Sequence, residues 1–137
     1  MKPSKGMARG FTLLELLMVV LLLSVLLAVT IPASYSMVQG YRASLEAEKV
    51  LLFFSRLKRE SFQYSHLQEI KEKEGRLLIN NGEVVSWPDI LVRMDDPIMF
   101  YENGTSSGGV VEIEIHGYRF KIDIDTPSGT LVLQRGT

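Results

Sequence analysis

The chain has 137 residues, which leaves room for one domain of about 100 residues beyond its apolar start and disfavours a two-domain enzyme. It contains no cysteine, which excludes disulfides and cysteine-ligated zinc. The formal net charge is -1, and from Phe11 onward 12 basic side chains stand against 16 acidic ones. This balance disfavours strong non-specific binding to nucleic-acid phosphates over the whole surface.

A long apolar segment follows a short basic leader. Residues 16–31 hold no charged side chain, and with residues 11–14 the run reaches the roughly 20 residues that a membrane-spanning helix needs. A secretory signal peptide is one alternative, but its apolar core is usually about 7–15 residues long and a small-x-small cleavage site follows it. The sequence therefore predicts a membrane helix over residues 11–33.

One carboxylate, that of Glu15, lies inside the front edge of this apolar segment. An ionisable group in a membrane helix usually has a partner or a function. Two interpretations stay open at this point. Glu15 reaches into the lipid headgroups of a plain single-span anchor, or it meets a positive charge inside a protein assembly.

The stretch Gly10-Phe-Thr-Leu-Leu-Glu15 closely resembles the processing site of type IV prepilins and of the pseudopilins of type II secretion and competence systems. The resemblance implies that residues 1–10 are a leader, that a membrane prepilin peptidase cuts between Gly10 and Phe11, and that the new amine is methylated. Glu15 would match the acidic residue of the family, which pairs with the Phe11 amine of a neighbouring subunit in the filament.

This pairing also follows from elementary electrostatics. Cleavage after Gly10 would place a positive amine at the start of a helix, one turn before Glu15. Helices packed side by side with a one-step stagger could then neutralise each other's charges, and in hydrocarbon such a pair is worth far more than in water. Glu15 would set the register of assembly, and Gly10 would be small because a peptidase must approach the backbone closely.

Pro32 lies where the apolar segment gives way to polar sequence. A proline in a helix interior removes one amide donor and pushes on the carbonyl four residues earlier, which kinks or loosens the helix. A proline also occurs at this place in the pilin family, where the helix near it can extend during filament packing. The alternative is a helix that merely kinks at the membrane interface.

Residues 34–137 are predicted to form an extracytoplasmic globular domain that opens with an amphipathic helix from Tyr35 to about Ile70. Apolar residues recur at spacings of three and four, namely Ala47, Val50, Leu51, Phe54 and Leu57. The charged tail from Gln68 to Glu74, with Gly75 after it, resembles a fraying helix end with a glycine stop.

After Gly75 the apolar period changes to two, which indicates strands. The predicted strands are 77–79, 84–87, 98–101, 110–115, 118–124 and 130–134. Asn81 and Gly82 predict a two-residue hairpin turn between the first two. Pro127, Ser128 and Gly129 predict the turn before the last strand.

The hairpin of residues 110–124 is the clearest of these elements. If His116 and Gly117 form a two-residue turn, one face is wholly apolar and the other brings Glu114 opposite Arg119 and Glu112 opposite Lys121. A slip of one residue would bury four charges. We therefore predict an α+β architecture, in which the second half of a long N-terminal helix packs on the apolar side of a small antiparallel sheet.

The segment FYENGTSSGGVVEIEI (residues 100–115), together with Gly129, resembles the C-terminal part of minor pseudopilins of the GspH, FimT and ComGD types. Read alone, GTSSGG could suggest phosphate binding, but it lacks the lysine of a nucleotide loop and leads into a strand. Between residues 35 and 96 the interpretation rests on pattern alone.

For the remaining candidate residues, a structural role explains the sequence better than a catalytic or binding role. His66 and His116 have no serine and acid arrangement typical of a triad. Asp95, Asp96, Asp123 and Asp125 lack the spacing of a calcium loop, so we expect no metal and no cofactor. DNA contacts could come from the basic residues Lys58, Arg59, Arg119, Lys121 and Arg135, although nearby acids favour ordinary surface charge. Phe53 and Trp87 are expected in a core or interface.

These observations predict a non-enzymatic minor pilin or pseudopilin. It would be held in the cell membrane as a single-pass precursor and, after trimming, added to a cell-surface pilus that serves DNA uptake in competence. The implied partners are major and minor pilins, prepilin peptidase, an assembly ATPase, membrane platform proteins and membrane lipid. The alternatives are a GspH-like pseudopilin of type II secretion, a constitutive single-span surface anchor and, last, an enzyme.

Overall fold

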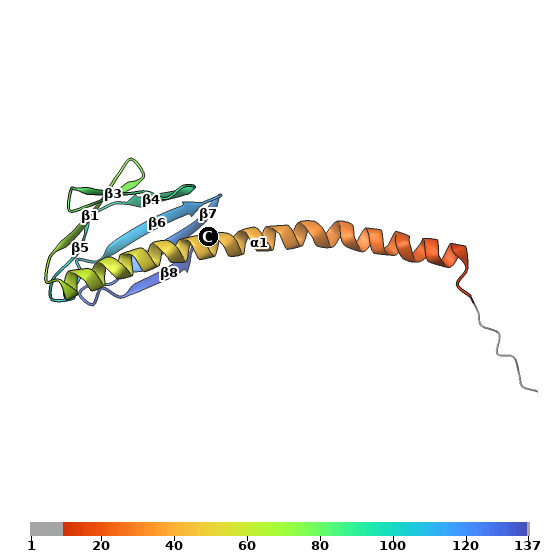
Figure 1. Ribbon diagram of the computed structural model, residues 1–137, viewed down its shortest axis with the longest axis horizontal. Helices are drawn as coiled ribbons and strands as arrows, with labels where there is room; N and C mark the ends of the chain where they lie inside the picture. Colours follow the sequence, from red (N-terminus) through yellow and green to blue (C-terminus); the bar gives the residue numbers. More distant parts are fainter. Residues whose placement is uncertain (1–9, 137) are drawn as a thin grey trace, which may run out of the picture. The chain divides into compact units, whose positions relative to one another are not determined.

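The computed structural model describes residues 10–136; the predicted leader before Gly10, with Lys2, Lys5 and Arg9, lies outside the described residues. The described residues form one helix and eight strands (Figure 1). These are α1 (Leu13–Gln63), β1 (Gln68–Lys73), β2 (Arg76–Ile79), β3 (Glu83–Val85), β4 (Ile90–Met94), β5 (Ile98–Phe100), β6 (Gly109–Ile115), β7 (Tyr118–Ile124) and β8 (Leu131–Arg135). The chain divides into two compact units between Gln39 and Gly40, and α1 runs through both.

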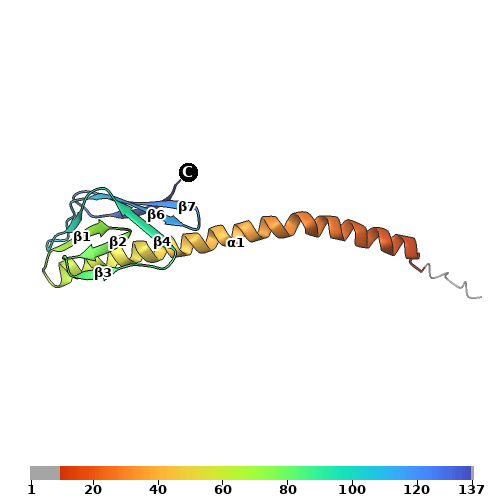
Figure 2. The same ribbon diagram turned by 90° about the horizontal axis from the view of Figure 1, so that it is seen from above.

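The second unit buries one stripe of α1. Its buried helix residues recur at alternating spacings of three and four and are Gly40, Ala43, Ala47, Val50, Phe54, Leu57 and Ser61. They join apolar side chains of the strands in one hydrophobic core. Figure 2 shows the strands gathered beside this half of the helix. The predicted stripe is confirmed, with Leu51 only half-buried at its margin.

The predicted end of the helix near Ile70 is wrong, because α1 ends at Gln63. Ser65 takes a left-handed backbone conformation with φ of 49°, and the amide of His66 donates to the carbonyl oxygen of Ser61 at 3.1 Å. This is the hydrogen-bond pattern of a Schellman cap, with serine in the position that glycine usually takes. The cap frees the following residues to form a strand.

The segment predicted as a fraying tail is strand β1. Its side chains alternate between buried and half-buried positions from Gln68 to Lys71, which is the period of a strand. Gly75 does not stop a helix, since Glu74 and Gly75, both with positive φ, turn β1 into β2. Charged residues on the outer side of β1 obscured its short apolar component in the sequence.

The α+β prediction of an apolar N-terminal helix with its second half on antiparallel structure is confirmed as a pilin-like layout. The strands, however, form two four-stranded sheets where one small sheet was predicted. The first has the order β3-β2-β1-β5 and the second the order β4-β6-β7-β8. The additional strands are β1 and β4, neither of which was predicted as a strand.

The β6–β7 hairpin has the predicted register throughout. Ile115 pairs with Tyr118, while Glu114 pairs with Arg119 and Glu112 with Lys121. His116 and Gly117 form the turn, both with positive φ. The inward-facing side chains Val111, Ile113, Ile115, Phe120 and Ile122 are all buried.

The β2–β3 hairpin is also present, but its loop differs from the prediction. Ile79 pairs with Glu83, so the loop has the three residues Asn80, Asn81 and Gly82. Both asparagines have positive φ, which the amide side chain tolerates better than most. Trp87 lies beyond β3 and packs edge-on against Phe53, with ring centroids 5.1 Å apart, as expected for a core or interface residue.

Candidate processing and assembly segment

The first helical turn is organised by Thr12. The amide of Glu15 donates to Thr12 Oγ1 at 3.2 Å, and the amide of Leu16 donates to the Thr12 carbonyl oxygen at 3.1 Å. Thr12 is therefore the N-cap of α1, and Glu15 is the third helical residue, where a carboxylate favours the positive end of the helix dipole. Thr12 was not predicted as a functional residue, although the T-x-x-E spacing of a capping box is visible in the sequence.

Gly10 and Phe11 precede the helix in non-helical backbone, and both are exposed. A Cβ built on Gly10 meets no atom within 4 Å, and Gly10 is not among the glycines with positive φ. The fold of the described residues therefore gives no steric reason for glycine at this position. Any requirement for a small residue there must come from another molecule that binds this backbone.

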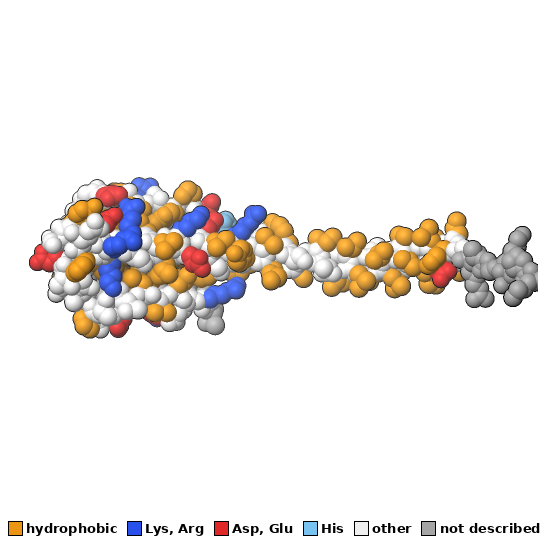
Figure 3. Space-filling view, turned by 60° about the horizontal axis from the view of Figure 1, so that its bottom comes forward, with side chains coloured by type: hydrophobic (Ala, Val, Ile, Leu, Met, Phe, Trp, Pro, Cys, Tyr) orange, Lys and Arg blue, Asp and Glu red, His pale blue; other side chains and the backbone are white. Residues whose placement is uncertain are grey.

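The first half of α1 is apolar on every side. It includes a stretch that could cross a membrane by length and composition, and none of that stretch is buried by the described chain. Figure 3 shows hydrophobic side chains along this half of the helix, whereas charged side chains gather on the globular part. An apolar surface of this extent needs lipid or protein around it.

Hydroxyl groups in the same region are satisfied within the helix. Thr30 Oγ1 donates to the Leu26 carbonyl oxygen at 2.8 Å, and Ser34 Oγ donates to that of Thr30 at 2.9 Å. Such back-bonding hides polar groups from an apolar environment. Helix α1 continues through Pro32, which lies between these two residues.

The predicted processing residues thus lie together at one end of α1, and Pro32 lies apart from them. Gly10, Phe11 and Glu15 span six residues, whereas Pro32 follows Glu15 by 17 residues, or about 25 Å of helix. All four belong to the first unit.

The candidate DNA-binding side chains have mixed surroundings. Lys58 Nζ donates to the carbonyl oxygens of Ser128 and Gly129, at 2.8 and 2.9 Å, and so holds the turn before β8. The Arg135 guanidinium lies 5.3 Å from the centroid of the Tyr118 ring. These contacts give both residues structural roles.

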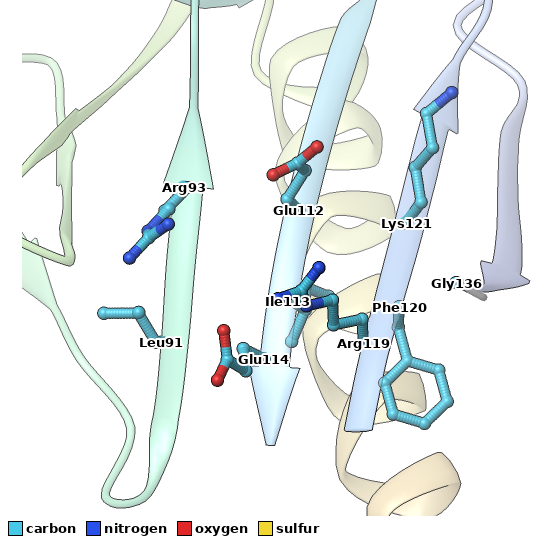
Figure 4. A pocket seen from close by; sticks show the side chains of 9 residues that line it. All are labelled: Leu91, Arg93, Glu112, Ile113, Glu114, Arg119, Phe120, Lys121 and Gly136. Atoms are coloured by element: carbon cyan, nitrogen blue, oxygen red, sulfur yellow. The ribbon is translucent and has the colours of Figure 1, made fainter. Parts of the chain in front are cut away.

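Of the three remaining basic candidates, Arg59 is exposed on α1, whereas Arg119 and Lys121 lie on the outer face of β7. Together with Glu112 and Glu114 they line a groove of about 340 Å³ (Figure 4). Lys121 Nζ lies 2.9 Å from Asp123 Oδ1. The groove therefore carries charges of both signs, unlike a surface that binds phosphates alone.

The histidines and the glycine-rich segment have local structural roles. His116 forms the β6–β7 turn, as expected. His66 Nε2 lies 2.7 Å from Gln68 Nε2, and the His66 carbonyl oxygen accepts a hydrogen bond from the buried Ser61 Oγ at 2.9 Å. Residues 104–108 end the connection from β5 to β6, with Ser106 pairing with Phe100, and lead into a strand.

The comparisons with known proteins concern the N-terminal segment. Residues 5–31 match the prokaryotic N-terminal methylation motif. This motif is a type IV pilin-like prepilin signal, and it supports the pilin and pseudopilin family for this chain. The match covers 27 of the 137 residues, so it concerns this segment alone. With the apolar helix, it is consistent with a membrane-anchored, pilus-associated protein. No curated protein and no solved structure matches the chain.

Proposed function

We propose that this chain is a minor pilin or pseudopilin of a competence type IV pilus and takes part in pilus assembly and DNA uptake. The observation that carries the proposal is the methylation motif over residues 5–31, in whose described part exposed, non-helical backbone at Gly10 and Phe11 leads into a capped apolar helix. In this proposal, residues 1–10 are the leader, 11–33 the membrane and assembly helix, and 34–137 the extracytoplasmic domain.

Trimming would occur between Gly10 and Phe11. A peptidase must bind its substrate in an extended, accessible backbone, and these two residues have an exposed, non-helical one. Cleavage there leaves Thr12 in the chain, so the N-cap of α1 survives processing. The new amine of Phe11 would then be methylated, which keeps its positive charge.

Glu15 would pair with the Phe11 ammonium of a neighbouring subunit. Its carboxylate belongs to an exposed residue of the first helical turn, and the surrounding helix surface is apolar. Inside a bundle of such helices, an unpaired carboxylate would cost several kcal/mol, of order 3–5 when one partner of a buried pair is removed. The pair would therefore fix the stagger between subunits. Pro32 would let the helix adjust during packing.

The processing step is tested with a Gly10→Leu variant of the full chain. A bulky side chain at the cleavage site should leave an untrimmed, membrane-bound precursor, because it blocks close approach of the peptidase. Gly6→Leu, the same change inside the leader, is the matched control and should be trimmed normally. Mass spectrometry of the membrane fraction reads the N-terminus, and a mature Gly10→Leu chain beginning at Phe11 would refute the assigned site.

The biological role is tested by deleting the chain from its host. We expect transformation by added DNA to be lost and to return with the wild-type chain. Unchanged transformation with loss of a secreted protein would instead favour a GspH-like pseudopilin of type II secretion. If the chain stays untrimmed and never enters a filament, the result would favour a constitutive single-span surface anchor.

A further inference from the structure

The outer face of the sheet β4-β6-β7-β8 carries its charges in stripes along the strands. The central strand β6 contributes the acids Glu112 and Glu114. The strands on either side contribute bases: Arg93 of β4 pairs in register with Glu112, and β7 contributes Arg119 and Lys121. Figure 4 shows these side chains around the groove that crosses the three strands.

Most of these charged side chains form no ion pair within the described part of the chain. Lys121 forms an ion pair with Asp123 on its own strand. Within residues 10–136, the side chains of Glu114 and Arg119 take part in no hydrogen bond or ion pair, although they are cross-strand neighbours. The exposed face therefore offers acids and bases in adjacent rows to a partner.

We propose that this face binds the same face of a second copy of the chain, about a two-fold axis that runs along the strands between β6 and β7. Such an axis places β7 of the partner over β6, and β6 of the partner over β7, without a shift along the strands. Each Glu114 then meets the Arg119 of the other copy, and each Glu112 meets its Lys121. The two-fold rotation exchanges the positions of β6 and β7. Each acid on β6 of one copy therefore lies opposite a base on β7 of the other.

The flanking strands fit the same arrangement. The axis brings β4 of one copy opposite β8 of the other, so Leu91, which is 38% exposed, faces Gly136, where no side chain occupies the space. Arg93 faces Gln134, whose amide oxygen can accept a hydrogen bond from the guanidinium. Neither contact opposes like charges.

Because both copies are held in one membrane, a small interface is sufficient for self-association. Four strands of five to seven residues present roughly 400 Å² per copy, half of what stable complexes in solution bury. Chains held in one membrane meet at a high effective concentration, which favours weak contacts. The strands of this sheet run broadly along the second half of α1 (Figure 1), so a two-fold axis along them keeps the second halves of the two helices pointing the same way. Two chains anchored in one membrane must have the same orientation. The proposed dimer therefore depends on the membrane anchor that is part of the proposed function.

The test is a charge-reversal exchange in the full chain, with two differently tagged copies expressed in one membrane and co-purified in mild detergent. Glu114→Arg alone should lower self-association about tenfold, because the introduced guanidinium of each copy then opposes Arg119 of the other. Arg119→Glu alone should do the same with two acids. Mixing the two variants should restore wild-type co-purification, since every contact again joins opposite charges.

The control is Lys73→Glu, a charge reversal on an exposed residue of β1 in the other sheet, which should leave co-purification unchanged. Raising the salt from about 0.1 to about 1 M should weaken the wild-type contact, because the screening length falls from about 10 to about 3 Å.

Three outcomes would overturn the proposal. They are wild-type chains that do not co-purify, variants that self-associate as the wild type does, and a mixture that fails to recover. Recovery of a different subunit in place of a second copy, sensitive to Glu114→Arg, would also overturn it. The assay needs neither trimming nor DNA uptake, so its failure is distinguishable from failure of the proposed function.

Discussion

The two halves of α1 differ in composition and in their relation to the rest of the chain, since the first is apolar on every side and the second has one apolar stripe. From Leu13 to Val38 the large hydrophobic side chains are exposed, whereas Val50 and Phe54 are wholly buried in a core. The second half buries one apolar stripe within its own unit, while Leu52 and Phe62 stay exposed. The first half does not, so its composition has a physical explanation only if lipid or other subunits cover it.

Alanine substitutions in the two halves of α1 should differ most in their effect on the free energy of unfolding of the globular unit. Phe54→Ala removes a buried ring and should lower the free energy of unfolding of the globular unit by about 3–5 kcal/mol. Leu21→Ala removes an exposed side chain, and should leave that free energy within about 0.5 kcal/mol. Thermal unfolding followed by circular dichroism in detergent measures both. Equal destabilisation would show that the first half also contributes to the core.

The globular unit also depends on a specific polar contact. Lys58→Met keeps much of the side-chain length but removes both hydrogen bonds to the turn before β8, so the free energy of unfolding should fall by about 1–2 kcal/mol. Lys49→Met, at an exposed helix position, is the matched control and should change it by less than about 0.5 kcal/mol. An equal response to both substitutions would contradict the role of Lys58.

A smaller effect is expected where the first half begins. Thr12→Ala removes the N-cap and should weaken the first turn of α1 by about 1 kcal/mol, without changing the unfolding of the globular unit. Faster amide hydrogen exchange at Glu15 and Leu16 would report it. Thr12→Ser keeps the hydroxyl and should preserve the protection; loss of protection in Thr12→Ser as well would argue against the cap.

Strong local patterns in the sequence predicted their elements well. The β6–β7 hairpin followed from strict alternation with opposite charges on one face, because a slip of one residue would bury charge. The buried stripe of α1 followed from its spacing. The segment from Gly10 to Glu15 was found by its motif, which is local and does not depend on tertiary structure.

The missed elements depend on contacts that a local pattern does not contain. Strand β1 has the sequence of a charged helix end, and only the serine-based cap at Ser65 and pairing with β2 and β5 make it a strand. Strand β4 is short and has one buried residue, Val92, so its period is weak. The division into two sheets likewise depends on long-range pairing. The proposed partner of Glu15 belongs to another subunit, so a single chain cannot contain it.

The most direct test of the account is incorporation of a Glu15→Leu chain into filaments. If the first half of α1 serves assembly, this chain should be trimmed to begin at Phe11 and keep the wild-type unfolding temperature. Its amount in purified filaments, quantified against Glu48→Leu as an exposed control in the second half, should fall about tenfold. Wild-type incorporation of trimmed Glu15→Leu chains would contradict the pairing of Glu15 with a neighbouring amine.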